Sequence, residues 1–474
     1  MIGRETEARQ LEDLYDSGKA ELVAVYGRRR IGKTYLINEV FGNRFTFKHT
    51  GLSPAEETPA GAMRKQLSQF YLSLQEYGAE KTRTPKNWQE AFFMLRKLLE
   101  EKDNGGRQVV FIDELPWLDT KRSGFITGFE SFWNGWGSAR SNLMVVVCGS
   151  ATSWMHDNVI NNHGGLYGRV TYEINLRQFS LAETEQFFNS KGISFSRYDI
   201  AQSYMITGGI PFYLGYFNRS LSLPQNIDRM FFCKDSPLKD EYRRLFSSVF
   251  ANPGEMMAIV GQLAKRKPGY TRKELLTLLR KTDGGNLSSN LRTLEASDFI
   301  VRYVPFGGDG RQVHYKLTDP FCIFYLKFMA GKDSDRLGDG YWEEGIDSQE
   351  IVSWRGLAFE NVCFRHVEQI KKSLQIEGVR TKESAWTTDD AQIDMLIDRA
   401  DNVVNLCEIK YYSDMFTVNK EYHLSMMHRK NILSDSIPRT KTVRNTLITT
   451  FGLKKNEYSG VFSNVITLDD LFNR

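Results

Sequence analysis

The chain has little cysteine and no long apolar run. These two absences argue against a disulfide-stabilised protein and against a membrane-spanning protein. Its five cysteines, at positions 148, 233, 322, 363 and 407, are scattered among 474 residues without a CxxC pair. This spacing does not predict a disulfide framework, and we expect buried thiols in a reducing cytoplasm. No apolar segment approaches the length of a membrane-spanning helix. The opening residues, MIGRETEARQLEDL, indicate an amphipathic charged helix rather than a signal peptide. We therefore expect a cytoplasmic protein with no membrane partner.

The chain also has a small net charge and few histidines. The formal net charge of +4 is too small to indicate a partner by itself, so the distribution of charge matters more. His366, His423 and His428 lack the spacing of metal ligands. Hydrophobic content of 41% and charged content of 25% exclude long disorder. At 474 residues the chain exceeds what one core usually accommodates, so we expect two to four domains.

The stretch ELVAVYGRRRIGKTYLINEV, at residues 21–40, places GxxxxGK[ST] between a strand pattern and a helical pattern. This is typical of a loop whose backbone N–H groups and following helix bind phosphate. Lys33 would contact the β and γ phosphates during catalysis, and the Thr34 hydroxyl would bind Mg2+. The predicted ATP-binding residues of this loop are Gly27, Arg28, Arg29, Arg30, Ile31, Gly32, Lys33, Thr34 and Tyr35.

Two further strand patterns end in polar residues. The apolar run 109–112 leads into Asp113 and Glu114, as expected of a buried parallel strand ending beside the phosphate loop. Asp113 would hold Mg2+ through water, and Glu114 would orient and deprotonate the attacking water, which favours ATP hydrolysis over simple binding. The strand LMVVVCGSA ends at Ser150, which is either a sensor of the γ-phosphate or a turn residue.

Hydrophobic periodicity divides the chain into five segments. Residues 1–175 alternate strand and helix patterns, which predicts an α/β core with a mostly parallel sheet covered on both faces. Its aromatic-rich helical stretches, 63–77 and 88–101, are expected to contribute to the core. Residues 176–250 predict a helical lid that opens with a capping box of Ser180 and Glu183. A polar, glycine-rich stretch within 331–350 predicts a linker, and the last domain covers 351–474.

The segment 251–330 has the order helix, helix, hairpin, which suggests a winged helix-turn-helix. Between residues 260 and 316 it has 11 Lys or Arg against 5 Asp or Glu. Arg292, Arg302, Arg311 and Lys316 lie on or after the predicted recognition helix, which favours a nucleic-acid partner, DNA. The alternative is a winged helix that packs within the protein and exposes a solvated basic face.

The C-terminal segment predicts a second site. If Ala400–Asn402 form the turn of a hairpin, residues whose numbers sum to 802 face each other, so Asp394 lies opposite Glu408. Lys410 projects on the same face, and Glu360 on the preceding helix could join. Carboxylates are the ligands that Mg2+ prefers, so Glu360, Asp394 and Glu408 form a candidate metal site, with Glu408 and Lys410 as catalytic residues. The alternative is a structural acid pair bridged by lysine.

The segments IGRETEARQLEDL, VVFIDE, VVVCGSA, LYGR and TGGIPFYL, together with the phosphate loop, resemble the archaeal-type ATPases, a P-loop branch close to the AAA+ and STAND groups. The resemblance implies Walker A and B roles for the motifs above. It also implies that Arg169 in LYGR contacts the γ-phosphate, and action from a neighbouring subunit would make the protein a homo-oligomer. The remainder resembles a winged helix followed by a PD-(D/E)xK restriction-endonuclease-like domain, although no Pro precedes Asp394.

These features support more than one function. The first is an ATP-binding and hydrolysing protein whose nucleotide state controls a DNA-directed C-terminal module acting as a Mg2+-dependent nuclease. The alternative is a STAND-like nucleotide switch that binds DNA or protein partners and carries an inactive nuclease-like domain. A third is a C-terminal domain that only mediates protein contacts.

Overall fold

The computed structural model describes residues 1–53, 58–161, 164–250, 252–282, 284–308, 312–332, 338, 340–387 and 392–473. The chain divides into two compact units. The first consists of Met1–Gln178 and Arg244–Pro253, and the second consists of Phe179–Arg243 and Gly254–Arg474. Arg311 lies outside the described residues.

A five-stranded parallel sheet forms the centre of the first unit. Its strand order is β2-β3-β4-β1-β5. The strands are β1 (Glu21–Tyr26), β2 (Phe45–Thr50), β3 (Gln108–Asp113), β4 (Leu143–Gly149) and β5 (Tyr172–Asn175). Every residue of β1, β3 and β4 is buried, as expected of strands covered on both faces. The predicted parallel α/β core is confirmed.

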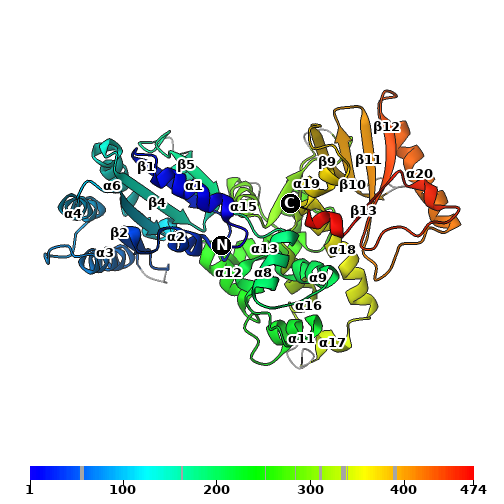
Figure 1. The fold of residues 1–474 in the computed structure, drawn as a ribbon, viewed down its shortest axis with the longest axis horizontal. Coiled ribbons are helices and arrows are strands. Elements are labelled where there is room, and N and C mark those ends of the chain that lie inside the picture. The colour runs from blue at the N-terminus through cyan, green and yellow to red at the C-terminus, as the bar shows by residue number, and fades with distance from the viewer. Residues whose placement is uncertain are drawn as a thin grey trace. The chain divides into compact units, whose positions relative to one another are not determined.

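Helices cover this sheet (Figure 1). Aromatic side chains of three of them belong to a single buried cluster: Phe70 on α3, Trp88 and Phe92 on α4 and Phe125 on α6. The predicted assignment of these aromatic residues to the core is therefore confirmed. The helices of this unit are α1 (Glu5–Tyr15), α2 (Lys33–Phe41), η1 (Gly42–Arg44), α3 (Pro59–Glu76), α4 (Trp88–Glu101), α5 (Leu115–Leu118), α6 (Phe125–Gly135), η2 (Gly137–Ala139), α7 (Thr152–Met155) and η3 (His156–Ile160).

The second unit begins with helices, as predicted for 176–250. The Ser180 side chain accepts from the Glu183 N–H, and the Glu183 side chain accepts from the Ser180 N–H, so the predicted capping box is present. The elements are α8 (Leu181–Ser190), α9 (Arg197–Thr207), α10 (Pro211–Leu214), α11 (Leu223–Ile227), η4 (Asp228–Phe232) and α12 (Glu241–Val249), the last of which crosses the boundary between the units.

Next come four helices and a small antiparallel sheet of order β6-β8-β7. In chain order the elements are α13 (Pro253–Leu263), β6 (Tyr270–Thr271), α14 (Arg272–Leu278), α15 (Gly285–Ala296), β7 (Ile300–Tyr303), β8 (His314–Leu317) and α16 (Pro320–Phe328). Within the predicted linker, α17 (Tyr341–Glu344) carries Trp342, which is buried and has its ring centroid 5.0 Å from that of Phe328. The described part of the linker is thus anchored in a core.

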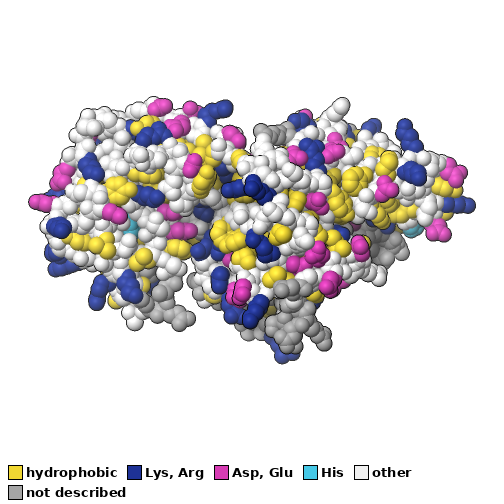
Figure 2. All heavy atoms as spheres, turned by 60° about the horizontal axis from the view of Figure 1, so that its bottom comes forward, with side chains coloured by type: hydrophobic (Ala, Val, Ile, Leu, Met, Phe, Trp, Pro, Cys, Tyr) yellow, Lys and Arg dark blue, Asp and Glu magenta, His cyan; other side chains and the backbone are white. Residues whose placement is uncertain are grey.

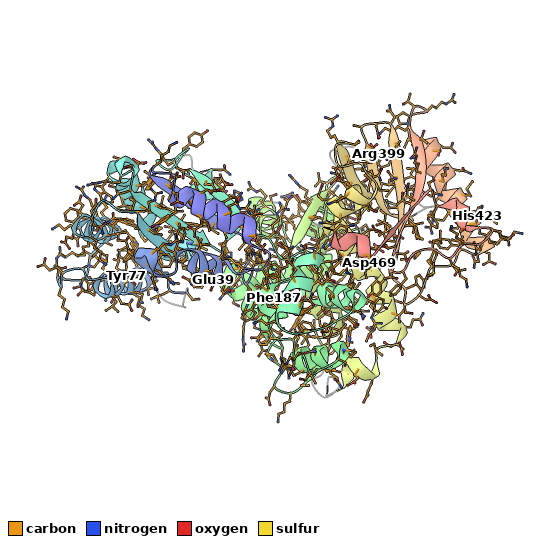
Figure 3. The ribbon with its side chains drawn as sticks, viewed as in Figure 1. Glu39, Tyr77, Phe187, Arg399, His423 and Asp469 are labelled. Carbon is orange, nitrogen blue, oxygen red and sulfur yellow. The ribbon has the colours of Figure 1, made fainter. Side chains whose placement is uncertain are left out.

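The C-terminal part contains a mixed five-stranded sheet of order β13-β12-β11-β10-β9. Its strands are β9 (Thr381–Thr387), β10 (Gln392–Arg399), β11 (Val403–Lys410), β12 (Thr442–Thr449) and β13 (Asn464–Thr467), accompanied by α18 (Gln349–Arg365), α19 (Val367–Ser373), α20 (Lys420–Ser436), η5 (Ser459–Val461) and η6 (Asp469–Phe472). Leu406 and Leu447 of the sheet pack in one core with Met426 of α20. Arg197 of α9 donates to Asp469 of η6 at 3.0 Å, and Asp469 is labelled in Figure 3.

The hairpin of β10 and β11 has the register that the sequence predicts. Its pairs run from Met395 opposite Cys407 to Asp398 opposite Val404, so the paired residue numbers sum to 802. The turn is stabilised by Arg399, labelled in Figure 3, whose Nε donates to Asp401 Oδ1 at 2.9 Å.

His366, which caps α18, is buried in the second unit. Its Nε2 accepts the Leu181 N–H at 3.0 Å, so the proton resides on Nδ1 and is donated to the Val362 carbonyl at 2.8 Å. Burial lowers the pKa of His366 to about 4, although the Val362 carbonyl opposes this shift. The ring is therefore neutral in the folded protein at pH 7.

His366 should make unfolding depend on pH. Because the folded pKa is depressed below the ordinary 6.5, its stabilisation is present above pH 6.5 and is lost as the pH falls to about 4. The loss amounts to about 3 kcal/mol. His366→Gln keeps an acceptor for Leu181, so its melting temperature should fall less than the parent's between pH 7 and pH 4. The exposed His428→Gln is the control and should follow the parent. Equal pH slopes in all three proteins would contradict the assignment.

Candidate functional site

The phosphate loop joins β1 to α2 and requires glycine at both of its key positions. Gly27 has φ 137°, and a Cβ there would overlap the Leu176 carbonyl oxygen. Gly32 adopts the left-handed conformation at φ 91° and caps α2. Arg28 and Ile31, which lie between the two glycines, are buried, whereas Tyr35 on α2 is 58% exposed. The guanidinium of Arg29 lies 5.5 Å from the centroid of the Trp117 ring.

Lys33 and Thr34 connect this loop to the ends of β3 and β4. Lys33 Nζ donates to the carbonyls of Gly27 at 3.0 Å and Arg28 at 2.9 Å, and to Ser150 Oγ at 3.0 Å. Thr34 Oγ1 donates to Asp113 Oδ2 at 2.7 Å. The structure therefore brings the predicted Walker residues and Ser150 into one network.

Ser150 links the lysine to the predicted general base. Its hydroxyl donates to Glu114 Oε1 at 2.8 Å, and its N–H donates to Glu114 Oε2 at 3.2 Å. Glu114 itself has left-handed backbone angles, φ 47° and ψ 49°, which are unfavourable for a non-glycine residue and recur at functional sites. Lys33 donates to the Ser150 hydroxyl oxygen, and the same hydroxyl donates to Glu114. A phosphate that binds Lys33 would therefore change the hydrogen bond between Ser150 and Glu114. The roles of Ser150 and Glu114 in catalysis remain predictions.

Thr34 and Asp113 also fit a Mg2+ ion. The two side chains place a hydroxyl and a carboxylate oxygen 2.7 Å apart, and hard oxygen ligands of this kind suit the ion. When bound, Mg2+ would neutralise charge on the phosphates.

Two further arginines bear on the ATPase site. Arg4 is buried and donates to the carbonyls of Ile31 at 3.1 Å and Arg177 at 2.7 Å, so it holds the phosphate loop in place. Sequence reasoning missed this role, although a charged residue directly before the first helix was a signal. Arg169 lies in an exposed turn, and no hydrogen bond or ion pair joins it to the phosphate loop within the described residues. Its γ-phosphate role stays a prediction.

At the predicted second site, Glu360 of α18 and Asp394 of β10 share one ammonium group. Lys267 Nζ lies 2.7 Å from Glu360 Oε1 and 3.4 Å from Asp394 Oδ1. Asp394 Oδ2 also accepts the Ile409 N–H at 3.2 Å. Burial and the nearby Asp394 charge raise the pKa of Glu360. Lys267, which the sequence did not indicate, is therefore the cation between these two acids.

Glu408 is buried and fully engaged by other side chains. Its carboxylate contacts Lys410 Nζ at 2.7 Å, Tyr422 Oη at 2.6 Å and Arg429 Nη1 at 2.7 Å. Burial is the largest single influence and lowers the pKa of Lys410, but the Glu408 charge, the hydrogen bond to Glu408 and the nearby Asp394 charge together raise the pKa above its ordinary value. The predicted contact between Glu408 and Lys410 is present, whereas Tyr422 and Arg429 of α20 were not foreseen.

Among the described residues, no three or more His, Cys, Asp or Glu side chains are grouped so that they could hold a metal ion. Glu360, Asp394 and Glu408 therefore do not meet as one cluster in this structure. Their role as metal ligands stays a prediction.

Some of the basic residues between positions 260 and 316 form ion pairs within the protein. Lys267 pairs with Glu360. Arg266 pairs with Glu274 at 2.9 Å, and Arg302 pairs with Glu295 at 3.4 Å. Lys316 lies over the Phe364 ring at 5.2 Å, whereas Arg292 is exposed. On the face shown in Figure 2, basic and acidic side chains are interspersed across the coloured surface.

The N-terminal part of the chain is similar to a known family of domains. Residues 1–217 match a family described as an ATPase domain predominantly from Archaea. An uncharacterized protein of Methanocaldococcus jannaschii is 25% identical over 421 residues, which cover 87% of each chain. A second protein of that organism, an uncharacterized ATP-binding protein, is 41% identical over 44 residues, or 9% of this chain and 75% of that one.

A solved structure shares the fold. The Walker-type ATPase of Pyrococcus abyssi has a TM-score of 0.50 and 20% identity, covering 69% of this chain and 96% of that one. Together with the matched ATPase domain, this likeness establishes a nucleotide-binding P-loop core. The protein is an ATP-hydrolysing enzyme. Within the described residues, none of its helices combines the length and apolar character needed to span a bilayer.

Lys33→Ala should weaken ATP binding by about 10²-fold, because a charged donor to the phosphates is lost. Calorimetry with a non-hydrolysable ATP analogue measures this change. Lys19→Ala, which removes an exposed lysine before β1, is the matched control and should bind like the parent. Unchanged affinity in Lys33→Ala would place the nucleotide elsewhere.

Glu114→Gln should lower kcat by about 10²–10⁴-fold, because an amide cannot accept the proton of the attacking water. Affinity for ATP should stay near the parent value, since Gln keeps an oxygen that accepts from Ser150. Single-turnover hydrolysis and filter binding separate the two quantities. Normal turnover in this variant would assign the base to another residue.

Proposed function

We propose that ATP binding and hydrolysis by residues 1–217 control a C-terminal module that acts on DNA as a Mg2+-dependent nuclease. In this proposal, residues 251–330 are a winged helix and residues 351–474 are a PD-(D/E)xK-like domain. The order helix, strand, helix, helix, strand, strand, from α13 to β8, supports the first assignment. Acids on α18, β10 and β11 around a mixed sheet support the second.

The observation that carries this proposal is the shared contact of Lys267 with Glu360 and Asp394. Two carboxylates repel each other unless a cation lies between them, and Lys267 provides that charge. A divalent ion would meet the same requirement. In this proposal the contact of Lys267 with the two acids keeps the nuclease site inactive, and activation requires Lys267 to leave the acid pair.

At the ATPase site, Thr34 and Asp113 would hold Mg2+, which would neutralise charge on the phosphates. Glu114 activates the attacking water. Ser150 acts as the sensor of the γ-phosphate, because its hydroxyl contacts both Lys33 and Glu114. Arg169 is exposed and therefore accessible to a neighbouring subunit, which supports its action across a homo-oligomer.

A nucleotide switch that binds DNA or protein partners and cuts nothing is the second candidate. It is favoured by Glu408, whose carboxylate already has three partners. Metal binding would have to replace at least one of these contacts.

Lys267→Met should strengthen Mn2+ binding by roughly tenfold or more, because removing one positive charge near 4 Å is worth about 1–4 kcal/mol. Electron paramagnetic resonance of free Mn2+ measures this affinity. Lys265→Met is the matched control, because Lys265 bonds to Gln262 rather than to the acids. Adding Asp394→Asn to Lys267→Met should remove the gain. Equal affinity in Lys267→Met and the parent would contradict the inactive-state proposal.

The same variants test cleavage with supercoiled plasmid, Mg2+ and ATP. Lys267→Met should nick faster than the parent, and adding Glu408→Ala should stop nicking. Cutting that persists with Glu408→Ala would remove the assigned nuclease site. Metal binding without any cutting would favour the switch.

A further inference from the structure

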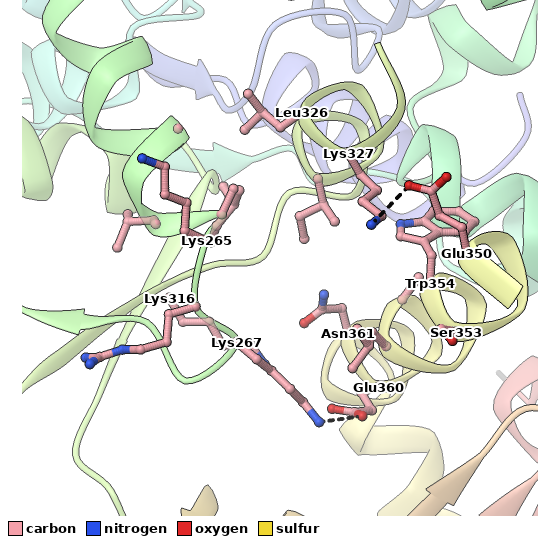
Figure 4. A pocket seen from close by; sticks show the side chains of 18 of the residues that line it. Lys265, Lys267, Lys316, Leu326, Lys327, Glu350, Ser353, Trp354, Glu360 and Asn361 are labelled. Atoms are coloured by element: carbon pink, nitrogen blue, oxygen red, sulfur yellow. Dashed lines mark hydrogen bonds and ion pairs between the residues drawn. The ribbon is translucent and has the colours of Figure 1, made fainter. Parts of the chain in front are cut away.

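A cavity of about 840 Å³ opens among α13, β8, α16 and α18 of the second unit (Figure 4). Its volume lies within the range of roughly 300–1,000 Å³ that is typical of small-molecule sites. We call it the lysine pocket, because its lining includes Lys265, Arg266, Lys267, Lys316 and Lys327.

The lysine pocket has more positive charge than its acids neutralise. Its lining acids are Glu350, which is 3.2 Å from Lys327, and Glu360, which is paired with Lys267. Lys316 has neither an ion pair nor a hydrogen bond to its Nζ within the described residues. Burial lowers the pKa of Lys316 to about 8, and the nearby Lys267 charge adds to this effect while Glu360 opposes it. An anion in the pocket would stabilise the charged form of this amine.

Two buried polar groups in the pocket wall lack partners. The indole N–H of Trp354 and the side-chain oxygen of Asn361 have no hydrogen bond among the described residues, and the two side chains are 4% and 9% exposed. Figure 4 shows the Asn361 amide pointing into the open space. Buried polar groups are rarely left unpaired, so these groups indicate a ligand that is both acceptor and donor.

Apolar side chains form much of the remaining wall. Leu263, Leu317, Ile323, Leu326 and Leu357 line the cavity from four different elements. Such a surface accommodates a flat, uncharged body, because contact with it removes apolar area from water. The pocket thus combines an anion-binding side with a side suited to a ring.

We propose that the lysine pocket binds a nucleoside phosphate, either as a free nucleotide or as the phosphorylated end of a nucleic-acid strand. Lys316 and Lys265 donate to the phosphate oxygens, the Trp354 N–H donates to a further oxygen, and Asn361 bonds to the base edge. The base lies against the apolar wall. This site is separate in sequence from the phosphate loop, and the proposal does not require the protein to cut DNA.

The test uses the full-length Lys33→Ala protein, so that the phosphate loop contributes little to nucleotide binding. The probes are AMP, adenosine, and a short dT oligonucleotide with and without a 5′-phosphate, each measured by calorimetry. Lys316→Met and Trp354→Phe should each lower the affinity by about tenfold, because each removes a donor to a charged group. Lys455→Met, which changes an exposed lysine outside the pocket, should have no effect.

AMP binding without adenosine binding would support the proposal with a free nucleotide as ligand. Oligonucleotide binding that requires the 5′-phosphate would support it with a strand end as ligand. Trp354→Phe preserves an aromatic ring, and thermal unfolding of each variant verifies that the protein is folded. The proposal is overturned if no probe binds at millimolar concentration, if binding does not require phosphate, or if folded Lys316→Met and Trp354→Phe bind like the Lys455→Met control.

Discussion

Removing a carboxylate from water is costly unless a cation or several donors replace the lost hydration, and this requirement shapes both sites. In the ATPase core, Ser150 supplies two hydrogen bonds to Glu114, and Thr34 supplies one to Asp113. In the second unit, Lys267 supplies the charge between Glu360 and Asp394. Each acid is thus stabilised by a partner that a ligand or ion could replace.

The two sites differ in what replaces those partners. Lys33 contacts loop carbonyls and Ser150, and a bound triphosphate offers it stronger acceptors. Lys267 leaves its acids only if another cation takes its position or an anion attracts it. The ATPase network is therefore organised around an incoming anion, whereas the acid pair is organised around the exchange of one cation for another.

The ATPase site could be predicted because its information is local. Gly27, Gly32 and Lys33 lie within seven residues, and apolar runs identify the strands that end at Asp113 and Ser150. The register of the β10–β11 hairpin was also predictable, because its turn can be recognised in the sequence and the position of the turn determines which residues of the two strands face each other. Lys267 was not predictable, because its acids are 93 and 127 residues away and a basic run looks the same whether it faces solvent or a carboxylate.

Helix α20 places Tyr422 and Arg429 two turns apart, and both side chains contact the same carboxylate of Glu408. A small outward displacement of that rigid helix would break both contacts together. Glu408 would then lose two of its three partners in one step and keep only Lys410, so whatever moves the helix would change the surroundings of this carboxylate abruptly.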